Sequence, residues 1–249
     1  STKEYRILVL YGKSLKNYEK ELEVINQVNW LIGKNIIIFQ EAINCTYHVK
    51  GKEDAFALIK KYELQYSDYA EFWVGAYSVS ETQEDRSWIV DSIINKIQDG
   101  KLLSSIYYQK QISIILIKEG KYIDAIELLS SIERSNGENE EVSRLKIEAY
   151  IQSGRPIDAL TEIVDHYEIL KNDDKILYLL LSISLSNKRP VSEEVLSDAK
   201  KLDDPRILML IAEVEYINEN IAEARKFAMR SMLRASSESE ELFDLSLKY

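Results

Sequence analysis

A seven-residue motif occurs twice in this chain, first from Gly120 and again from Gly154. Gly120–Ile126 and Gly154–Leu160 are identical at four of the seven positions, and the second follows the first after ~34 residues. Apolar residues at spacings of three and four flank each copy, which predicts a helix before the glycine and another after it. The stripes predicted to be buried are Ile106, Ile112, Ile115, Leu116, Ile126, Leu128, Leu129 and Ile132 for the first copy, and Leu145, Ala149, Tyr150, Leu160, Ile163, Val164 and Tyr167 for the second. Because one helix pair cannot bury its apolar face alone, several pairs must stack.

The composition excludes most other fold classes. With 8 glycines and 3 prolines in 249 residues, the chain lacks the turn residues of a β-sandwich or a doubly wound sheet. Its 45% apolar content is too high for disorder. We therefore expect an all-α fold, an α-solenoid of stacked antiparallel helix pairs, with helix over more than about 65% of residues against roughly a third in globular proteins.

Weaker copies of the helix pair extend in both directions. Residues 175–187 and 191–201 form one pair, joined at Arg189-Pro190, and Asp204-Pro205 is typical of a helix start. We expect five to six pairs within residues 35–236. We expect residues 1–34 to form an N-terminal helical segment that packs on or caps the array, with a helix favoured over a strand at residues 5–11. We expect residues 237–249 to form a capping helix or the cut edge of a longer array, beginning with a capping box at Ser237.

The repeat resembles the tetratricopeptide repeat (TPR) family, whose unit has the same length of roughly 34 residues. Gly120 and Gly154 match its small residue at the turn between the helices, and Ala125 and Ala159 match its alanine where the helices cross. Two positions differ from the family pattern. Gln109 and Ser143 stand where the family has a Trp early in the repeat, and Gly137 and Lys171 stand where it has the Pro that ends the repeat. The resemblance implies a non-enzymatic protein–protein interaction scaffold or adaptor within a multiprotein assembly. The alternative is a regulatory or peptide-sensing module of a larger protein.

Charge and cysteine content limit the partners and the compartment. The chain has 42 acidic and 32 basic residues, and a net charge of −10 disfavours nucleic acid as a partner. The single Cys45 excludes an internal disulfide and favours a reducing compartment, so we expect a cytoplasmic protein. The longest nearly apolar stretch, residues 176–185, is shorter than the ~20 residues of a transmembrane helix.

Candidate catalytic and metal-binding patterns are weak. Gly12-Lys13-Ser14 resembles the end of a phosphate-binding loop, but Ile7 stands where that loop needs an earlier glycine. Cys45 and His48 lack the further ligands of a zinc site. Acidic pairs such as Glu84-Asp85, Asp173-Asp174 and Asp203-Asp204 are expected to cap helices. We therefore expect no enzyme, cofactor or metal site; an enzyme using the N-terminal segment is the least favoured alternative.

Three groups of residues are candidates for partner binding. The first is an aromatic helix face, which either fills the space between loosely matched repeats or contacts a partner. The second is a pair of cations at the fifth repeat position, which the TPR resemblance places on the concave surface; Ile114 and Glu148 replace the asparagine of a carboxylate clamp. The third is a basic stripe, for which a solvated role at a helix C-terminus is favoured. These groups are Tyr69, Phe72, Trp73 and Tyr77; Lys110 and Arg144; and Lys226, Arg230 and Arg234.

Overall fold

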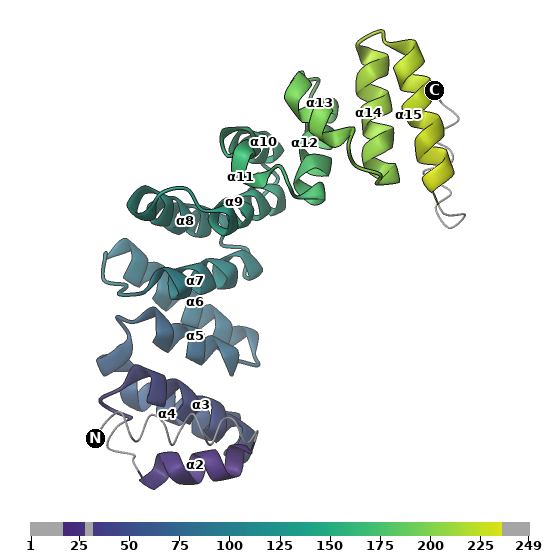
Figure 1. The fold of residues 1–249 in the computed structure, drawn as a ribbon. Helices are drawn as coiled ribbons and strands as arrows, with labels where there is room; N and C mark the ends of the chain where they lie inside the picture. Colours follow the sequence, from purple (N-terminus) through teal and green to yellow (C-terminus); the bar gives the residue numbers. More distant parts are fainter. Residues whose placement is uncertain (1–16, 28–31, 236–249) are drawn as a thin grey trace. The chain divides into compact units, whose positions relative to one another are not determined.

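The computed structural model describes residues 17–27 and 32–235. Of these residues 78% are helical, in 14 helices, and none belongs to a strand (Figure 1). The one sheet-like feature among them is an isolated parallel bridge between Tyr69 and Leu103. The prediction of an all-α fold with more than about 65% helix is therefore confirmed.

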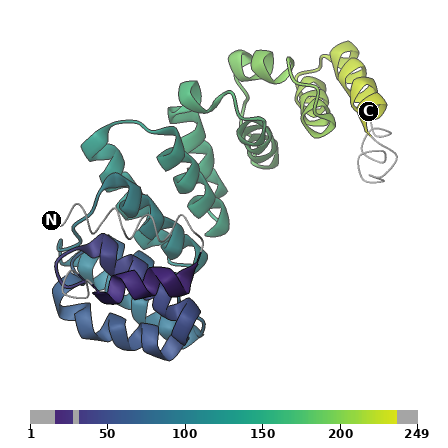
Figure 2. The ribbon, with the colours of Figure 1, turned by 60° about the horizontal axis from the view of Figure 1, so that its bottom comes forward.

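The chain divides into two compact units, residues 1–136 and 137–249. In the first unit α3, α5 and α7 lie side by side, and each packs against the helix that follows it. Helix α2, dark purple in Figure 2, packs on α3. The helices are α2 (Tyr18–Gln27), α3 (Ile36–Lys50), α4 (Lys52–Tyr66), α5 (Ala70–Ser78), α6 (Gln83–Gln98), α7 (Ile106–Lys118) and α8 (Tyr122–Asn136).

The second unit continues the helix pairs. Helix α9 packs on α10, α12 lies between α10 and α14, and α14 packs closely along α15. All helices of this unit contribute to one hydrophobic core, in which Leu181, Leu208 and Ile211 are fully buried. The helices are α9 (Glu140–Gln152), α10 (Pro156–Asp165), α11 (Tyr167–Leu170), α12 (Asp174–Ser186), α13 (Glu193–Ala199), α14 (Pro205–Ile217) and α15 (Ile221–Arg234).

The turn between paired helices has the same geometry in successive repeats. Gly120 and Gly154 both have φ of 73°, in the left-handed region that favours glycine. The Gly120 N–H donates to the Ile117 carbonyl (3.0 Å), and Gly154 does the same to Ile151 (3.0 Å). These bonds close the C-terminus of the first helix and turn the chain into the second.

Lys188 and Glu219 occupy this turn position in the next two repeats. Their φ values are 53° and 65°, and their N–H groups bond the carbonyls three residues back at 3.1 and 3.0 Å. The interval from Gly154 to Lys188 equals that from Gly120 to Gly154, so the motif keeps its period there, whereas Glu219 follows Lys188 at a shorter interval. The sequence predicts a helix pair joined at Arg189-Pro190, but it does not indicate positive φ at Lys188 or Glu219, because neither residue is glycine.

Two positions of the predicted buried stripes are exposed. Ile106 is 41% exposed because it is the first residue of α7, where no preceding turn covers it. Val164 is 57% exposed because the adjacent Ile163 takes the core-facing position of α10. The described part of the N-terminal segment, which is expected to be helical, includes α2, with Leu22 and Ile25 buried. The features predicted at residues 5–14 and 237–249 lie outside the described residues.

The crossing alanines are buried as predicted, since Ala125 and Ala159 are both 0% exposed. We expect Ala125→Leu and Ala159→Leu each to destabilise the protein by roughly 1–3 kcal/mol, because the added atoms overpack the helix crossing. Urea unfolding followed by circular dichroism measures this cost. Ile123→Leu, on the exposed face of α8, is the matched control and should change stability by less than about 0.5 kcal/mol. If Ala125→Leu and Ala159→Leu are both as stable as this control, the repeat register is wrong.

Glu215 of α14 predicts a dependence of stability on pH. Burial raises the pKa of this carboxyl, but bonds from Lys200 (2.5 Å) and Asn220 (2.8 Å) outweigh it, so the pKa lies below its ordinary value. A carboxyl whose pKa is lower in the folded than in the unfolded state stabilises the folded protein at pH values above its unfolded pKa of roughly 4.3. That stabilisation is lost as the pH falls through the folded-state pKa. We expect the stability difference between wild type and Glu215→Gln, measured by urea unfolding, to shrink below about pH 4.3. A difference independent of pH would contradict this linkage.

Candidate interaction surfaces

Phe72 and Trp73 belong to the core of the first unit. They are 0% and 1% exposed; the Phe72 ring stacks on Phe39 with 5.4 Å between centroids, and Trp73 meets Phe72 edge-on at 4.8 Å. The Trp73 indole N–H donates to the Ser67 carbonyl (2.7 Å). These two side chains fill the space between helices, so the prediction that they form a partner surface is wrong for them.

The other two aromatic candidates are accessible. Tyr77 is half-buried, and its hydroxyl donates to Glu119 Oε1 at 2.6 Å, which ties α5 to the turn after α7. Burial and then this bond to a carboxylate raise the pKa of Tyr77 to about 12, so it stays a neutral donor. Tyr69 is 39% exposed at the start of α5.

Tyr69 adjoins further exposed apolar residues that sequence analysis did not identify. The backbone of Leu103 bonds that of Asp68 (2.6 Å) and Ala70 (3.1 Å), which pairs Leu103 with Tyr69. Leu103 is 55% exposed, and Ile106 and Tyr107, which follow it closely, are 41% and 60% exposed. We name Tyr69, Leu103, Ile106 and Tyr107 the Tyr69–Tyr107 patch.

Arg144 is bonded within its own unit. It forms ion pairs with Glu140 one turn earlier (2.6 Å) and with Asp173, the N-cap of α12. Arg144 is therefore not an isolated cation, and Lys110, half-buried on α7, is not free either. Because the two residues belong to different units, a groove lined by both stays a prediction.

The basic stripe of α15 anchors that helix. Arg230 and Arg234 both pair with Asp203 (3.1 and 2.7 Å), and Arg230 also donates to the Leu202 carbonyl (3.3 Å). Lys226 pairs with Glu223 at 3.1 Å on the same helix. These bonds link α15 to the connection between α13 and α14. Arg230 is half-buried there, so the expectation of a merely solvated role is wrong for it, whereas Arg234 stays exposed, as that role requires.

The acidic pairs and the Cys45–His48 pair have structural roles. Asp173 and Asp204 accept N-cap bonds from backbone N–H groups, and Asp85 completes a capping box with Thr82, as predicted. Cys45 is fully buried, and the His48 ring stacks on Tyr18 with 4.0 Å between centroids.

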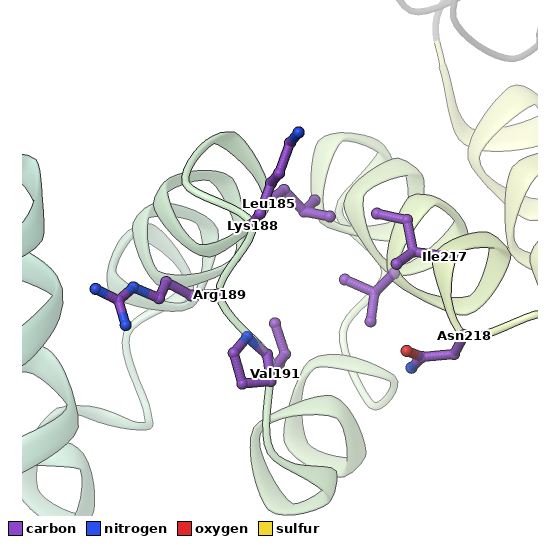
Figure 3. A pocket seen from close by; sticks show the side chains of 8 residues that line it. Leu185, Lys188, Arg189, Val191, Ile217 and Asn218 are labelled. Carbon is purple, nitrogen blue, oxygen red and sulfur yellow. The ribbon is translucent and has the colours of Figure 1, made fainter.

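A groove of about 490 Å³ opens between the C-terminal ends of α12 and α14. Figure 3 shows Leu185, Val191 and Ile217 around this space. Lys188 extends outward from the connection that follows α12, and Arg189 points to the side away from Ile217. We name it the α12–α14 groove. No sequence pattern marked it, because its two walls are about one repeat apart.

No family model matches the chain, and no curated protein matches it either. Solved structures do. A TPR protein from Parabacteroides merdae matches with a TM-score of 0.50 and 8% identity over 98% of each chain. The C-terminal part of a TPR repeat-containing protein from Cytophaga hutchinsonii matches with a TM-score of 0.52 and 14% identity over 97% of this chain and 98% of that one. This chain has a TPR-like fold.

A third similar structure is that of Naa15/Naa10 bound to HypK-THB, with a TM-score of 0.63 and 15% identity. The match covers 99% of the TPR-like chain, which spans 38% of the length of the matched one. At these identities the comparisons show the fold alone. Across residues 17–27 and 32–235, none of the helices combines the length and the apolar character needed to cross a bilayer.

Proposed function

We propose that this TPR-like chain is a non-enzymatic scaffold or adaptor that binds another protein as a subunit of a multiprotein assembly. The Tyr69–Tyr107 patch is the observation that carries this proposal. Four large apolar side chains, each about 40–60% exposed, stand at the starts of α5 and α7, where the backbone of Leu103 pairs with that of Tyr69. Contiguous exposed apolar residues on a folded protein mark a contact surface, and tyrosine is enriched at interface hot spots.

The fold supports the same proposal. Stacked helix pairs leave one face of each helix uncovered, so the array offers an extended surface for a partner. The matched Naa15/Naa10 structure is itself an assembly of several proteins. We also propose a reducing compartment such as the cytoplasm, since a lone buried thiol suits one.

Paired serine variants test the role of the patch. We expect Leu103→Ser with Tyr107→Ser to reduce recovery of at least one partner about tenfold, which corresponds to a loss of about 1.4 kcal/mol of binding free energy. The measurement is quantitative affinity purification of the tagged chain from its native cell, with partners identified by mass spectrometry. Both replaced side chains are more than half exposed, so the variant should keep the parent's thermal melt.

The matched control removes two exposed apolar side chains of the same unit that lie outside the patch. Leu64 is fully exposed and Ile123 is 74% exposed. The variant Leu64→Ser with Ile123→Ser should therefore retain every partner. A patch variant that recovers the same proteins in the same yield as this control would contradict the assignment of the patch. Failure of the parent chain to recover any protein beyond a tag-only control would contradict the proposed function itself.

A further inference from the structure

The α12–α14 groove exists because α13 begins late. Asn187-Lys188-Arg189-Pro190 stands one full repeat after Ser153-Gly154-Arg155-Pro156, with the same turn geometry. In the earlier repeat the second helix begins at Pro156 itself. In the later one it begins at Glu193, where Ser192 accepts the capping bond from the Val195 N–H (3.3 Å). Residues 190–192 therefore run as a non-helical connection, and the missing helical turn leaves space beside Leu185.

The floor and far wall of this groove are apolar. Leu185 and Val191 line one side, and Val214 and Ile217 of α14 line the other (Figure 3). Val214 is 5% exposed and forms the floor, whereas Ile217 is 62% exposed at the rim. A bulky apolar side chain entering the groove would lose contact with water on several sides at once.

Two cations at the rim have no bonded partner for their side chains within the described part of the chain. In the earlier repeat Arg155 pairs with Asp158 (2.7 Å) and lies over the Tyr150 ring (5.0 Å to its centroid). At the equivalent positions of the next repeat Arg189 finds Ser192 and Ser184, which offer neither a carboxylate nor a ring. Lys188 likewise makes no side-chain bond to a described residue, and both cations are exposed.

The charge at the rim differs from that of the whole chain. With a net charge of −10, the protein repels an acidic segment over most of its surface. The connection after α12 is a local exception, because two adjacent cations remain without intramolecular neutralisation. Glu193 and Glu194 follow, but they occupy the first turn of α13, where the helix dipole favours them, and neither lines the groove.

We propose that the α12–α14 groove binds a segment of a partner protein that presents a bulky apolar side chain flanked by Asp or Glu. The apolar side chain enters between Leu185 and Ile217, and the acidic residues face Lys188 and Arg189. This inference rests on the proposed scaffold function and adds to it a second site, in the other unit from the Tyr69–Tyr107 patch, with a defined chemistry.

Selection from a displayed library of random peptides about 12 residues long tests this specificity on the intact chain. We expect enrichment of sequences with Leu, Phe, Ile or Trp beside Asp or Glu. Synthetic versions of the enriched peptides should bind at least about tenfold more weakly to Lys188→Glu with Arg189→Glu, and also to Ile217→Glu. Binding to the parent should weaken as salt rises from about 0.05 to about 0.5 M, because the rim contacts are exposed.

The control reverses two other exposed cations of the second unit whose side chains bond no described residue. Lys175→Glu with Arg225→Glu changes the net charge equally but leaves the groove intact, so it should bind the peptides like the parent. Thermal melts establish that every variant is folded. Groove variants that bind like this control, or enriched peptides without acidic residues, would overturn the proposal while leaving the patch and the scaffold function standing. Self-association of the parent that Ile217→Glu abolishes would assign the groove to a second copy of the chain, and would equally overturn it.

Discussion

Replacing Lys146 with methionine should destabilise the protein by about 3–5 kcal/mol. Lys146 Nζ lies 2.6 Å from Glu162 Oε2 between α9 and α10, and the two side chains are only 7% and 8% exposed. Methionine has a similar shape but leaves the Glu162 carboxylate buried without that cation. Breaking a buried pair from one side is costly because the remaining charge stays desolvated. Urea unfolding followed by circular dichroism measures the loss.

Two further variants separate the charge from the packing. Lys146→Met with Glu162→Leu removes both charges and should recover most of the lost stability. Arg155→Ala breaks the exposed pair with Asp158, whose side chain is 46% exposed, and should cost no more than about 1 kcal/mol. If Lys146→Met is no more costly than Arg155→Ala, then the Lys146–Glu162 pair is not buried in solution.

Trp73→Ala should cost about 3–5 kcal/mol, the typical loss for truncating a buried aromatic side chain. The Trp73 ring is 1% exposed and packs edge-on against both Phe72 and Trp88, with 5.6 Å between the tryptophan centroids. Its indole N–H bond to Ser67 is lost as well. The same unfolding experiment measures the change.

Tyr107→Ala is the matched aromatic control, because Tyr107 is 60% exposed. It should change stability by less than about 0.5 kcal/mol while weakening partner binding. The reverse result, a stable Trp73→Ala that loses its partners, would restore Trp73 to the interaction surface and refute its place in the core.

The repeat could be predicted where its turn residue was glycine. Gly120 and Gly154 identify two turns, because glycine adopts positive φ without strain. Lys188 and Glu219 adopt the same conformation where the helix ends impose it, and nothing local distinguishes them from surface residues. Arg189-Pro190 was identified correctly as a turn, but Ser192 rather than the proline sets the start of α13.

Candidate sites were harder to predict because their contacts are long-range. Pairs one helical turn apart, such as Arg144 with Glu140, follow from spacing. The pairing of Arg230 with Asp203 joins positions on different elements, so periodicity says nothing of it. Likewise, Tyr69 and Leu103 come together through backbone bonds across the intervening helix pair. Composition shows that cations and aromatics are present, whereas only the fold shows which of them are already bonded.

Native mass measurement of the complex tests the scaffold function most directly. The tagged chain is purified from its own cell at native expression level and physiological salt, and its mass is determined without denaturation. We expect the principal species to be a complex of the 28.9 kDa chain with at least one different protein. Its mass should therefore exceed that of the chain without being an exact multiple of it. A principal species at the mass of the chain alone, or at an exact multiple of it, would contradict the account.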